Sequence, residues 1–164
     1  MNIMNIRVSL ILLLSLVATV MPAQVIKVGI IGLDTSHSTA FTRLINSDDQ
    51  AYQDFKVVAA YPYGSRTIES AYSRIPKYTE EVKGYGVTVV SSIAELLDIV
   101  DCVLLETNDG QVHLEQAAEV FNAGKKVYID KPIGATLAQA IAIFELAERY
   151  GVTTFLPQRS VSPN

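Results

Sequence analysis

Cysteine, tryptophan and histidine are scarce in this sequence of 164 residues, which contains one, none and two of them, respectively. Because Cys102 has no second cysteine to pair with, no intrachain disulfide can form, and its position in an apolar strand pattern predicts an inert core residue. Basic residues are also few, since 13 lysines and arginines stand against 17 aspartates and glutamates, for a net charge of −4. Nucleic acids and anionic membrane surfaces favour a basic face, so the composition argues against both as partners.

Long apolar runs are absent except near the N-terminus. Arg7 precedes a mostly apolar run over residues 8–20, and Met21-Pro22-Ala23 places a small residue before Gln24. The run is shorter than the roughly 20 residues that span a bilayer, so it predicts a secretory signal peptide over residues 1–23, with an uncleaved membrane anchor as the alternative. We therefore expect export to the periplasm or the extracellular space. Loss of this leader leaves 141 residues (164 less 23) with a net charge of about −5, which is the size of a single domain.

Strand and helix patterns alternate along residues 24–164. The apolar run Val25–Ile31 ends at Gly32 and indicates a strand buried on both faces. Further strands are predicted over residues 55–60, 87–90, 101–106, 126–129 and 152–156, and helices after residue 35, over 93–99, over 111–123 and over 136–150, with an irregular connection over 65–86 that holds one or two short helices. This alternation is typical of a Rossmann-type α/β fold, a doubly wound parallel sheet in strand order 3-2-1-4-5-6 with a ligand crevice where the order reverses.

Three helices carry specific expectations. The first and last are predicted to bury apolar stripes, formed by Ala40, Phe41, Leu44 and Ile45 in the first and by Leu137, Ala140, Ile141, Phe144 and Ala147 in the last. For the helix over 93–99, Ser91-Ser92 is predicted to cap the start, with Glu95 as the capping-box partner.

Polar side chains gather where the strands end. Asp34–His37 follows the first strand, Glu106–Asp109 the fourth, Asp130-Lys131 the fifth and Gln158-Arg159 the sixth. Because the carboxyl ends of parallel strands meet at one edge of the sheet, these groups are expected to converge on one rim. The helix start after Gly32 can bind a phosphate through its N–H groups and nearby hydroxyls, or can be a helix cap with a polar first turn.

Several runs resemble the N-terminal cofactor domain of the glucose–fructose oxidoreductase and inositol dehydrogenase (Gfo/Idh/MocA) family. They are Val28-Gly29-Ile30-Ile31-Gly32, Asp101–Leu105, and the stretch from His113 through Ala123-Gly124-Lys125 to Asp130-Lys131-Pro132. The resemblance implies binding of NAD or NADP and oxidation or reduction of a sugar, polyol or related compound. It places Lys131 beside the nicotinamide and the substrate hydroxyl, where an ammonium can stabilise an alkoxide or exchange its proton. It also implies that a second domain, which supplies substrate-binding groups and oligomer contacts, is missing from this sequence.

The sequence departs from the family pattern at three points of the rim. Gly32 takes the first of three glycine positions in the first turn, whereas Asp34 and His37 stand at the second and third. Asp130 replaces the more usual glutamate, and Pro62 takes the place of an acidic residue that binds the adenosine ribose. The resemblance implies the following site: Gly32, Asp34, Thr35, Ser36, His37, Ser65, Arg66, Glu106, Thr107, Asn108, Asp130 and Lys131 for the cofactor, with Lys131 and Asp130 also catalytic.

Alternatives remain open at this stage. Arg66 beside Ser65 favours NADP, through a 2′-phosphate, if a dinucleotide binds. The two replaced glycines favour instead an exported scaffold or binding protein that has lost the dinucleotide, and related exported proteins keep an NAD-dependent glycoside hydrolase open. A metal site from Asp34, His37 and His113 lacks ligand-like spacing, so no metal is predicted, and His113 is expected to cap or pack. A homo-oligomer is expected only with the second domain present.

Overall fold

The computed structural model describes residues 24–155, so the predicted signal peptide and the predicted rim residues Gln158 and Arg159 lie outside the described residues. The elements are β1 (Ile26–Ile31), α2 (Ser36–Ile45), the 3₁₀ helix η1 (Gln50–Tyr52), β2 (Phe55–Tyr61), α3 (Glu69–Tyr72), α4 (Ile75–Gly84), β3 (Thr88–Val89), α5 (Ile93–Ile99), β4 (Cys102–Leu105), α6 (Gly110–Asn122), β5 (Lys126–Ile129), α7 (Leu137–Tyr150) and β6 (Thr154–Phe155). None of the helices within this range is both long and apolar enough to cross a membrane.

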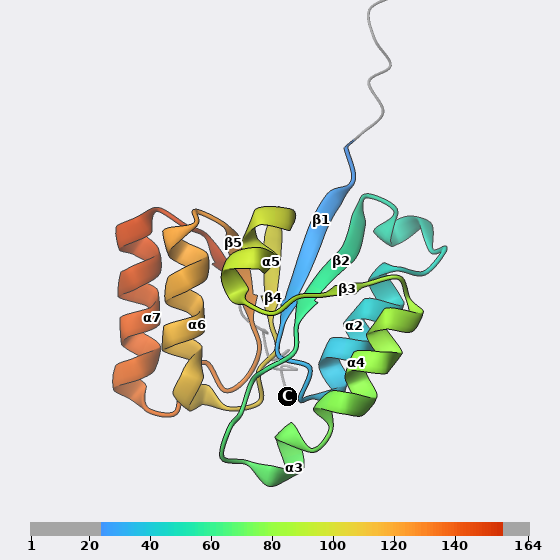
Figure 1. Ribbon diagram of the computed structural model, residues 1–164. Helices are drawn as coiled ribbons and strands as arrows, with labels where there is room; N and C mark the ends of the chain where they lie inside the picture. Colours follow the sequence, from blue (N-terminus) through green and yellow to red (C-terminus); the bar gives the residue numbers. More distant parts are fainter. Residues whose placement is uncertain (1–23, 156–164) are drawn as a thin grey trace, which may run out of the picture.

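All six strands are parallel and form one sheet in the order β3-β2-β1-β4-β5-β6, which confirms the predicted fold class. The order reverses at β1, whose two neighbours are β2 and β4 (Figure 1). Ile30 and Ile31 of β1 are fully buried on opposite sides of the sheet, as an apolar β-branched strand requires. The carboxyl ends of the strands and the loops that follow them therefore share the edge that is lowest in Figure 1.

Helices cover both faces of the sheet. In Figure 1, α5, α6 and α7 lie on one side, and α2 and α4 lie on the other. The core divides in the same way: one cluster joins Leu96, Phe121 and Ile143 of the first set to the sheet, and a second joins Val82 of α4 to Val28 and Ile30. Each face thus has its own apolar layer, and β1 contributes to both.

The predicted stripe of α2 is correct only in part: Phe41 and Ile45 are half-buried, and Ile45 packs against the core. The buried residues of this helix are Ser38, Thr39 and Thr42, whereas Ala40 and Leu44 are exposed. These small polar side chains can be buried because each hydroxyl donates to a backbone carbonyl one turn earlier, for example Thr42 Oγ1 to Ser38 O at 2.7 Å. A narrow face of this kind lets the helix lie close to the sheet.

The predicted stripe of α7 is largely wrong. Ile143 and Ala147 are buried, whereas Leu137 is 77% exposed, and Ile141 and Phe144 are exposed as well. The helix is apolar along two sides, so its periodicity alone could not select the side that packs against α6.

The capping of α5 follows the prediction with one shift. Ser92 Oγ accepts from the N–H of Glu95 at 3.1 Å, as expected for the cap. The carboxylate of Glu95, however, accepts from the N–H of Ser91 at 3.0 Å rather than from that of Ser92. The helix start is therefore where the sequence places it, with the reciprocal bond one residue earlier.

Candidate functional site

The first turn after β1 packs directly against the end of β4. Gly32 has φ of +92°, and a Cβ added there would lie 2.6 Å from the backbone nitrogen of Thr107. Both the positive φ and this close approach require glycine. Gly32 therefore serves the role that the first fingerprint glycine has in a dinucleotide-binding turn, a tight path from strand to helix.

Asp34, at the second glycine position, points into the rim and is fully buried. Its Oδ2 accepts from the N–H of Ser65 at 2.8 Å, and its Oδ1 accepts from the N–H of Asn108 at 3.1 Å. Burial raises the pKa of Asp34, and these two backbone N–H groups offset part of that rise. A side chain at Gly64 would overlap the carboxylate. One carboxylate thus joins the loops that follow β1, β2 and β4.

The hydroxyls at the start of α2 serve the helix itself. Thr35 is the N-cap and accepts from the N–H of His37 at 2.9 Å, and Ser38 Oγ donates to Thr35 O at 2.7 Å. Ser36 is exposed. Of the hydroxyls proposed from the sequence for phosphate contact, that of Ser36 is the one presented to solvent.

In the loop after β2, the adjacent residues Ser65 and Arg66 have different surroundings. Ser65 is buried, donates to Asp109 Oδ2 at 3.1 Å and accepts from the N–H of Ile68 at 3.0 Å, so its hydroxyl is engaged within the loop. Arg66 is exposed and lines a cavity of about 730 Å³ together with Tyr63 and Tyr72. The guanidinium is therefore the positive group available at this end of the rim.

The other end of the rim gathers His37, Glu106, Asp130 and Lys131. His37 Nδ1 lies 2.6 Å from Asp130 Oδ2, and Lys131 Nζ lies 3.9 Å from the same oxygen. The Lys131 side chain is 70% exposed, whereas Asp130 is buried. The peptide bond between Lys131 and Pro132 is cis. The loop after β5 thus lies against the start of α2.

Glu106 is the unusual member of this group. It is fully buried, and neither carboxylate oxygen has a hydrogen-bond partner among residues 24–155. Burial, followed by the nearby charge of Asp130, raises the pKa of Glu106 to about 8, and Lys131 opposes the rise. The carboxyl group therefore lines the interior of the rim and is not solvated.

Thr107 and His113 hold the β4–α6 loop in place. Thr107 Oγ1 donates to Gln116 Oε1 at 2.8 Å, while the His113 ring nitrogens face Thr107 O at 2.6 Å and Ile133 O at 3.2 Å. His113 is fully buried, which agrees with the predicted packing role. Both of its ring nitrogens face backbone carbonyls, and within residues 24–155 His37 is grouped with Glu106 and Asp130 rather than with Asp34 and His113.

Sequence reasoning missed two supporting residues. Asp109 caps α6 through Gln111 and also accepts from Ser65 and Thr67. Gln116 bonds Thr107 and donates to the carbonyl of Tyr63 at 3.3 Å. Asp109 stands just before a helix, which is a recognisable N-cap signal. The bonds that Asp109 and Gln116 make to residues far away in the sequence could not be predicted from it.

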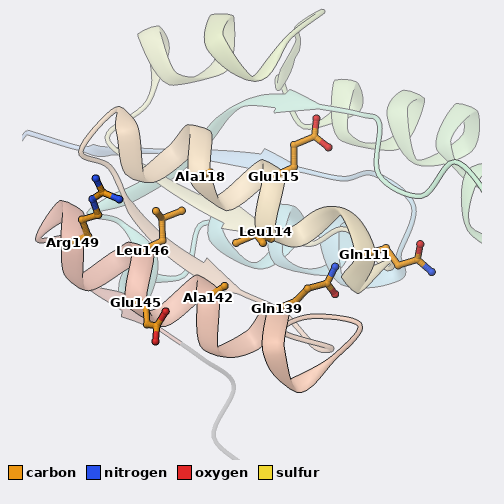
Figure 2. A pocket seen from close by; sticks show the side chains of 9 residues that line it. All are labelled: Gln111, Leu114, Glu115, Ala118, Gln139, Ala142, Glu145, Leu146 and Arg149. Atoms are coloured by element: carbon orange, nitrogen blue, oxygen red, sulfur yellow. The ribbon is translucent and has the colours of Figure 1, made fainter.

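The groove in Figure 2 is a separate feature. It has a volume of about 700 Å³ and runs between α6 and α7, where Leu114 and Leu146 lie among charged side chains such as Glu145. None of the predicted site residues lines it. We therefore take the rim, and not this groove, as the candidate site.

The two ends of the rim have groups that suit a nicotinamide dinucleotide, whereas the middle of the rim, at Asp34, departs from a dinucleotide site. Gly32 forms the tight turn, and Arg66 is exposed beside a cavity. Lys131 is exposed, and the oxygens of Glu106 have no hydrogen-bond partner in the described part of the chain. Between these ends, the Asp34 carboxylate takes the N–H groups of Ser65 and Asn108 and stands where the second glycine would leave room for the pyrophosphate. A bound dinucleotide would have to pass this carboxylate.

Comparisons with solved structures agree with the fold. Scyllo-inositol dehydrogenase from Lactobacillus casei, solved with NAD(H) and scyllo-inositol, matches with a TM-score of 0.64 and 24% identity over 81% of this chain and 36% of that one. The dehydrogenase MviM from Clostridium difficile matches with a TM-score of 0.62 and 24% identity over 80% of this chain and 38% of that one. The dehydrogenase WlbA from Bordetella pertussis, solved with NADH and UDP-GlcNAcA, matches with a TM-score of 0.62 and 21% identity over 80% of this chain and 36% of that one. At these identities the likeness shows the fold, and the chain spans a little over a third of each relative's length.

No curated protein matches the chain. The family model of the Gfo/Idh/MocA proteins, an oxidoreductase family with an NAD-binding Rossmann fold, matches residues 26–157. With the matching sheet order and the glycine-dependent first turn, this match covers most of the sequence and confirms the resemblance. The chain belongs to the Gfo/Idh/MocA oxidoreductase family, as its NAD-binding Rossmann domain.

Proposed function

We propose that the chain is the cofactor-binding half of an NAD(P)-dependent oxidoreductase that acts on a sugar, a polyol or a related compound. The observation that carries the proposal is the position of Lys131, whose ammonium is 70% exposed at the end of β5. Its neighbour Asp130 lies 2.6 Å from His37, at the start of α2, so the lysine belongs to the same rim as the first turn. The dehydrogenases of similar fold bind inositol or a nucleotide sugar, which supports the substrate class.

The dinucleotide would supply the hydride acceptor or donor. Lys131 would bind the substrate hydroxyl or carbonyl oxygen, stabilise negative charge on that oxygen and exchange a proton with it. Asp130, with Oδ2 at 3.9 Å from Lys131 Nζ, would position the ammonium. Buried Thr107, in the β4–α6 loop, and buried His113, in α6, would hold the end of β4 in register with that of β5.

Arg66 favours NADP over NAD. It is exposed at the end of β2, where the adenosine ribose lies in such folds, and no hydrogen bond or ion pair engages its guanidinium within residues 24–155. A guanidinium binds the 2′-phosphate in two-point geometry, and Pro62 offers no carboxylate for a free 2′-hydroxyl.

The second candidate is a binding or scaffold protein that keeps the fold without the dinucleotide. The observation in its favour is Asp34, whose buried carboxylate occupies the N–H groups of Ser65 and Asn108. The two candidates differ in a single measurable property, the affinity for NADPH and NADH.

That affinity is the test. The purified protein is titrated with each dinucleotide, and both the nicotinamide fluorescence and the melting temperature are followed. Specific binding raises stability by about 3 kcal/mol at a hundredfold excess over Kd. Under the first candidate NADPH binds more tightly than NADH, and Arg66→Ala removes the difference; no binding of either favours the scaffold.

Replacing Asp34 separates the causes. Asp34→Gly opens the second glycine position and is expected to tighten dinucleotide binding by tenfold or more, while it lowers stability by about 2–3 kcal/mol because two backbone N–H groups lose their acceptor. Asp34→Asn is the matched control, since it removes the charge and keeps the volume. If the two variants bind equally, charge and not space limits the affinity.

Export also belongs to this proposal. The apolar run over residues 8–20 after Arg7 supports a cleaved leader. Cell fractionation with N-terminal sequencing is expected to find Gln24 as the first residue outside the cytoplasm; an intact Met1 in the cytoplasmic or membrane fraction would contradict this.

A further inference from the structure

Three side chains from separate parts of the sequence meet at one point of the rim. His37 comes from the first turn of α2, Glu106 follows β4, and Asp130 follows β5. One ligand atom from each lies within 4.8 Å of the other two. The closest pair is His37 Nδ1 and Asp130 Oδ2, at 2.6 Å.

Glu106 distinguishes this group from an ordinary histidine–aspartate hydrogen bond. Its side chain is 0% exposed, and neither of its oxygens has a hydrogen-bond partner within residues 24–155. Buried polar atoms in folded proteins are nearly always paired, so such a carboxylate requires an explanation. Lys131 does not provide it, since its side chain is 70% exposed and its ammonium makes no hydrogen bond to Glu106.

The chemistry of the three groups selects a class of ligand. When a cation binds, Glu106 gives up its proton, and the imidazole nitrogen and two carboxylates then carry two negative charges, which a divalent cation neutralises. Magnesium and calcium prefer sites made of oxygen atoms alone, whereas imidazole suits zinc and its neighbours in the d-block. Histidine with carboxylates is a common donor set for zinc, and three protein ligands leave a fourth position open.

We propose that His37, Glu106 and Asp130 form a binding site for a divalent d-block cation, with Zn²⁺ as the best match. In a tetrahedral site, two ligand atoms about 2.1 Å from the ion lie about 3.4 Å apart. A separation of up to 4.8 Å therefore has to shorten by up to about 1.4 Å, and the 2.6 Å pair of His37 and Asp130 has to open by about 0.8 Å. His37 is 41% exposed, which allows that adjustment and gives the ion a path from solvent. The fourth ligand is then an oxygen atom of water or of a bound small molecule.

The site also accounts for two departures from the family pattern. His37 stands at the third glycine position and Asp130 in place of the more usual glutamate, and the structure brings these two replacements into direct contact. The proposal goes beyond the oxidoreductase function, because all three ligands are side chains of this chain and none is an atom of a dinucleotide.

The test uses the purified, tag-free protein after treatment with a chelator. Zn²⁺ is titrated by calorimetry and by thermal melting, Co²⁺ is added as a spectroscopic probe, and Mg²⁺ is the comparison ion. We expect one Zn²⁺ per chain, a visible Co²⁺ absorption band typical of nitrogen and oxygen ligands, and a rise in Tm of roughly 5 °C or more at a hundredfold excess over Kd. Mg²⁺ is expected to bind at least about tenfold more weakly than Zn²⁺.

Variants locate the ion. Glu106→Gln and His37→Ala are each expected to weaken Zn²⁺ binding by more than about tenfold and to abolish the Co²⁺ band. Glu145→Gln, which alters an exposed carboxylate on α7, is the control and is expected to bind as the wild type does. His37→Ala is informative even if the buried Glu106 variant fails to fold. Absence of stoichiometric binding, equal affinity in all variants, or preference for Mg²⁺ would overturn the proposal. Because no dinucleotide is present, this outcome is independent of the NADPH titration.

Discussion

Replacing Glu106 by glutamine should change how stability depends on pH. The pKa of this buried carboxyl is raised from 4.5 to about 8, chiefly by burial and then by Asp130. As the pH rises above 4.5, the unfolded chain releases this proton, whereas the folded chain retains it until about pH 8. The folded state then binds more protons than the unfolded state, so the free energy of unfolding falls over this interval and the stabilisation is fully present only below it.

The magnitude follows from the shift. Each pH unit costs about 1.4 kcal/mol, so the interval of about 3.5 units corresponds to a loss of about 5 kcal/mol. Local relaxation and water entry reduce such penalties in real proteins, and we expect about 2–5 kcal/mol. For a chain of this size that is a fall in Tm of roughly 5–20 °C between pH 5 and pH 8, which Glu106→Gln should largely remove.

Urea unfolding of the chelator-treated protein at half-unit steps from pH 5 to pH 8.5 measures this directly. The quantity of interest is the difference in unfolding free energy between wild type and Glu106→Gln, because most other titrations cancel in it. Glu145→Gln supplies the control, since its carboxylate is exposed. If the curves of wild type and Glu106→Gln run parallel across this range, Glu106 is not a buried, unpaired acid and the reasoning fails.

Two further predictions concern the rim. Lys131→Met should change Tm by no more than about 2 °C, because the side chain is 70% exposed and lies 3.9 Å from Asp130. Under the proposed oxidoreductase function, steady-state kinetics should show kcat reduced by about 10²–10⁴-fold. Gly32→Ala should lower the unfolding free energy by about 3 kcal/mol or more, because its Cβ would meet Thr107. In Gly86→Ala the same positive φ is present without a clash, so denaturant unfolding should show a loss of only about 1–2 kcal/mol; equal losses at the two glycines would refute the packing argument.

The fold could be predicted from the sequence because its signals are local and repeated. Strand β1 is an apolar run ended by Gly32, and Thr136 and Gly151 mark the two ends of α7 as a cap and a left-handed stop. Parallel order then follows from strand–helix alternation and right-handed crossovers. The wrong predictions concerned which face of a helix is buried, and not whether the helix exists. In α2 the residues against the sheet are hydroxyl-bearing, such as Thr42, and a hydropathy pattern assigns them to solvent.

The candidate site was predicted only in part, for a different reason. Convergence on one rim follows from topology, so the meeting of His37 with Asp130 was within reach. The state of each side chain was not, because burial depends on neighbours far away in the sequence. The sequence shows Asp34 at a glycine position, but it does not show that the loops at Ser65 and Asn108 enclose its carboxylate. Glu106 gave no signal at all beyond its place at the end of a strand.

The arrangement of the residues that replace the glycines favours a rim that still binds a ligand over a rim that has lost its binding function. A side chain that replaces a glycine without selection for a role tends to turn toward solvent, where it costs little. Here Asp34 accepts two backbone N–H bonds, and His37 reaches Asp130 at 2.6 Å. A buried Glu106 that finds no partner between residues 24 and 155 is unfavourable for folding, and an apolar residue there would be more stable. Since proteins tolerate such costs chiefly at functional sites, the scaffold hypothesis leaves Glu106 unexplained, whereas a ligand bound at the rim explains it.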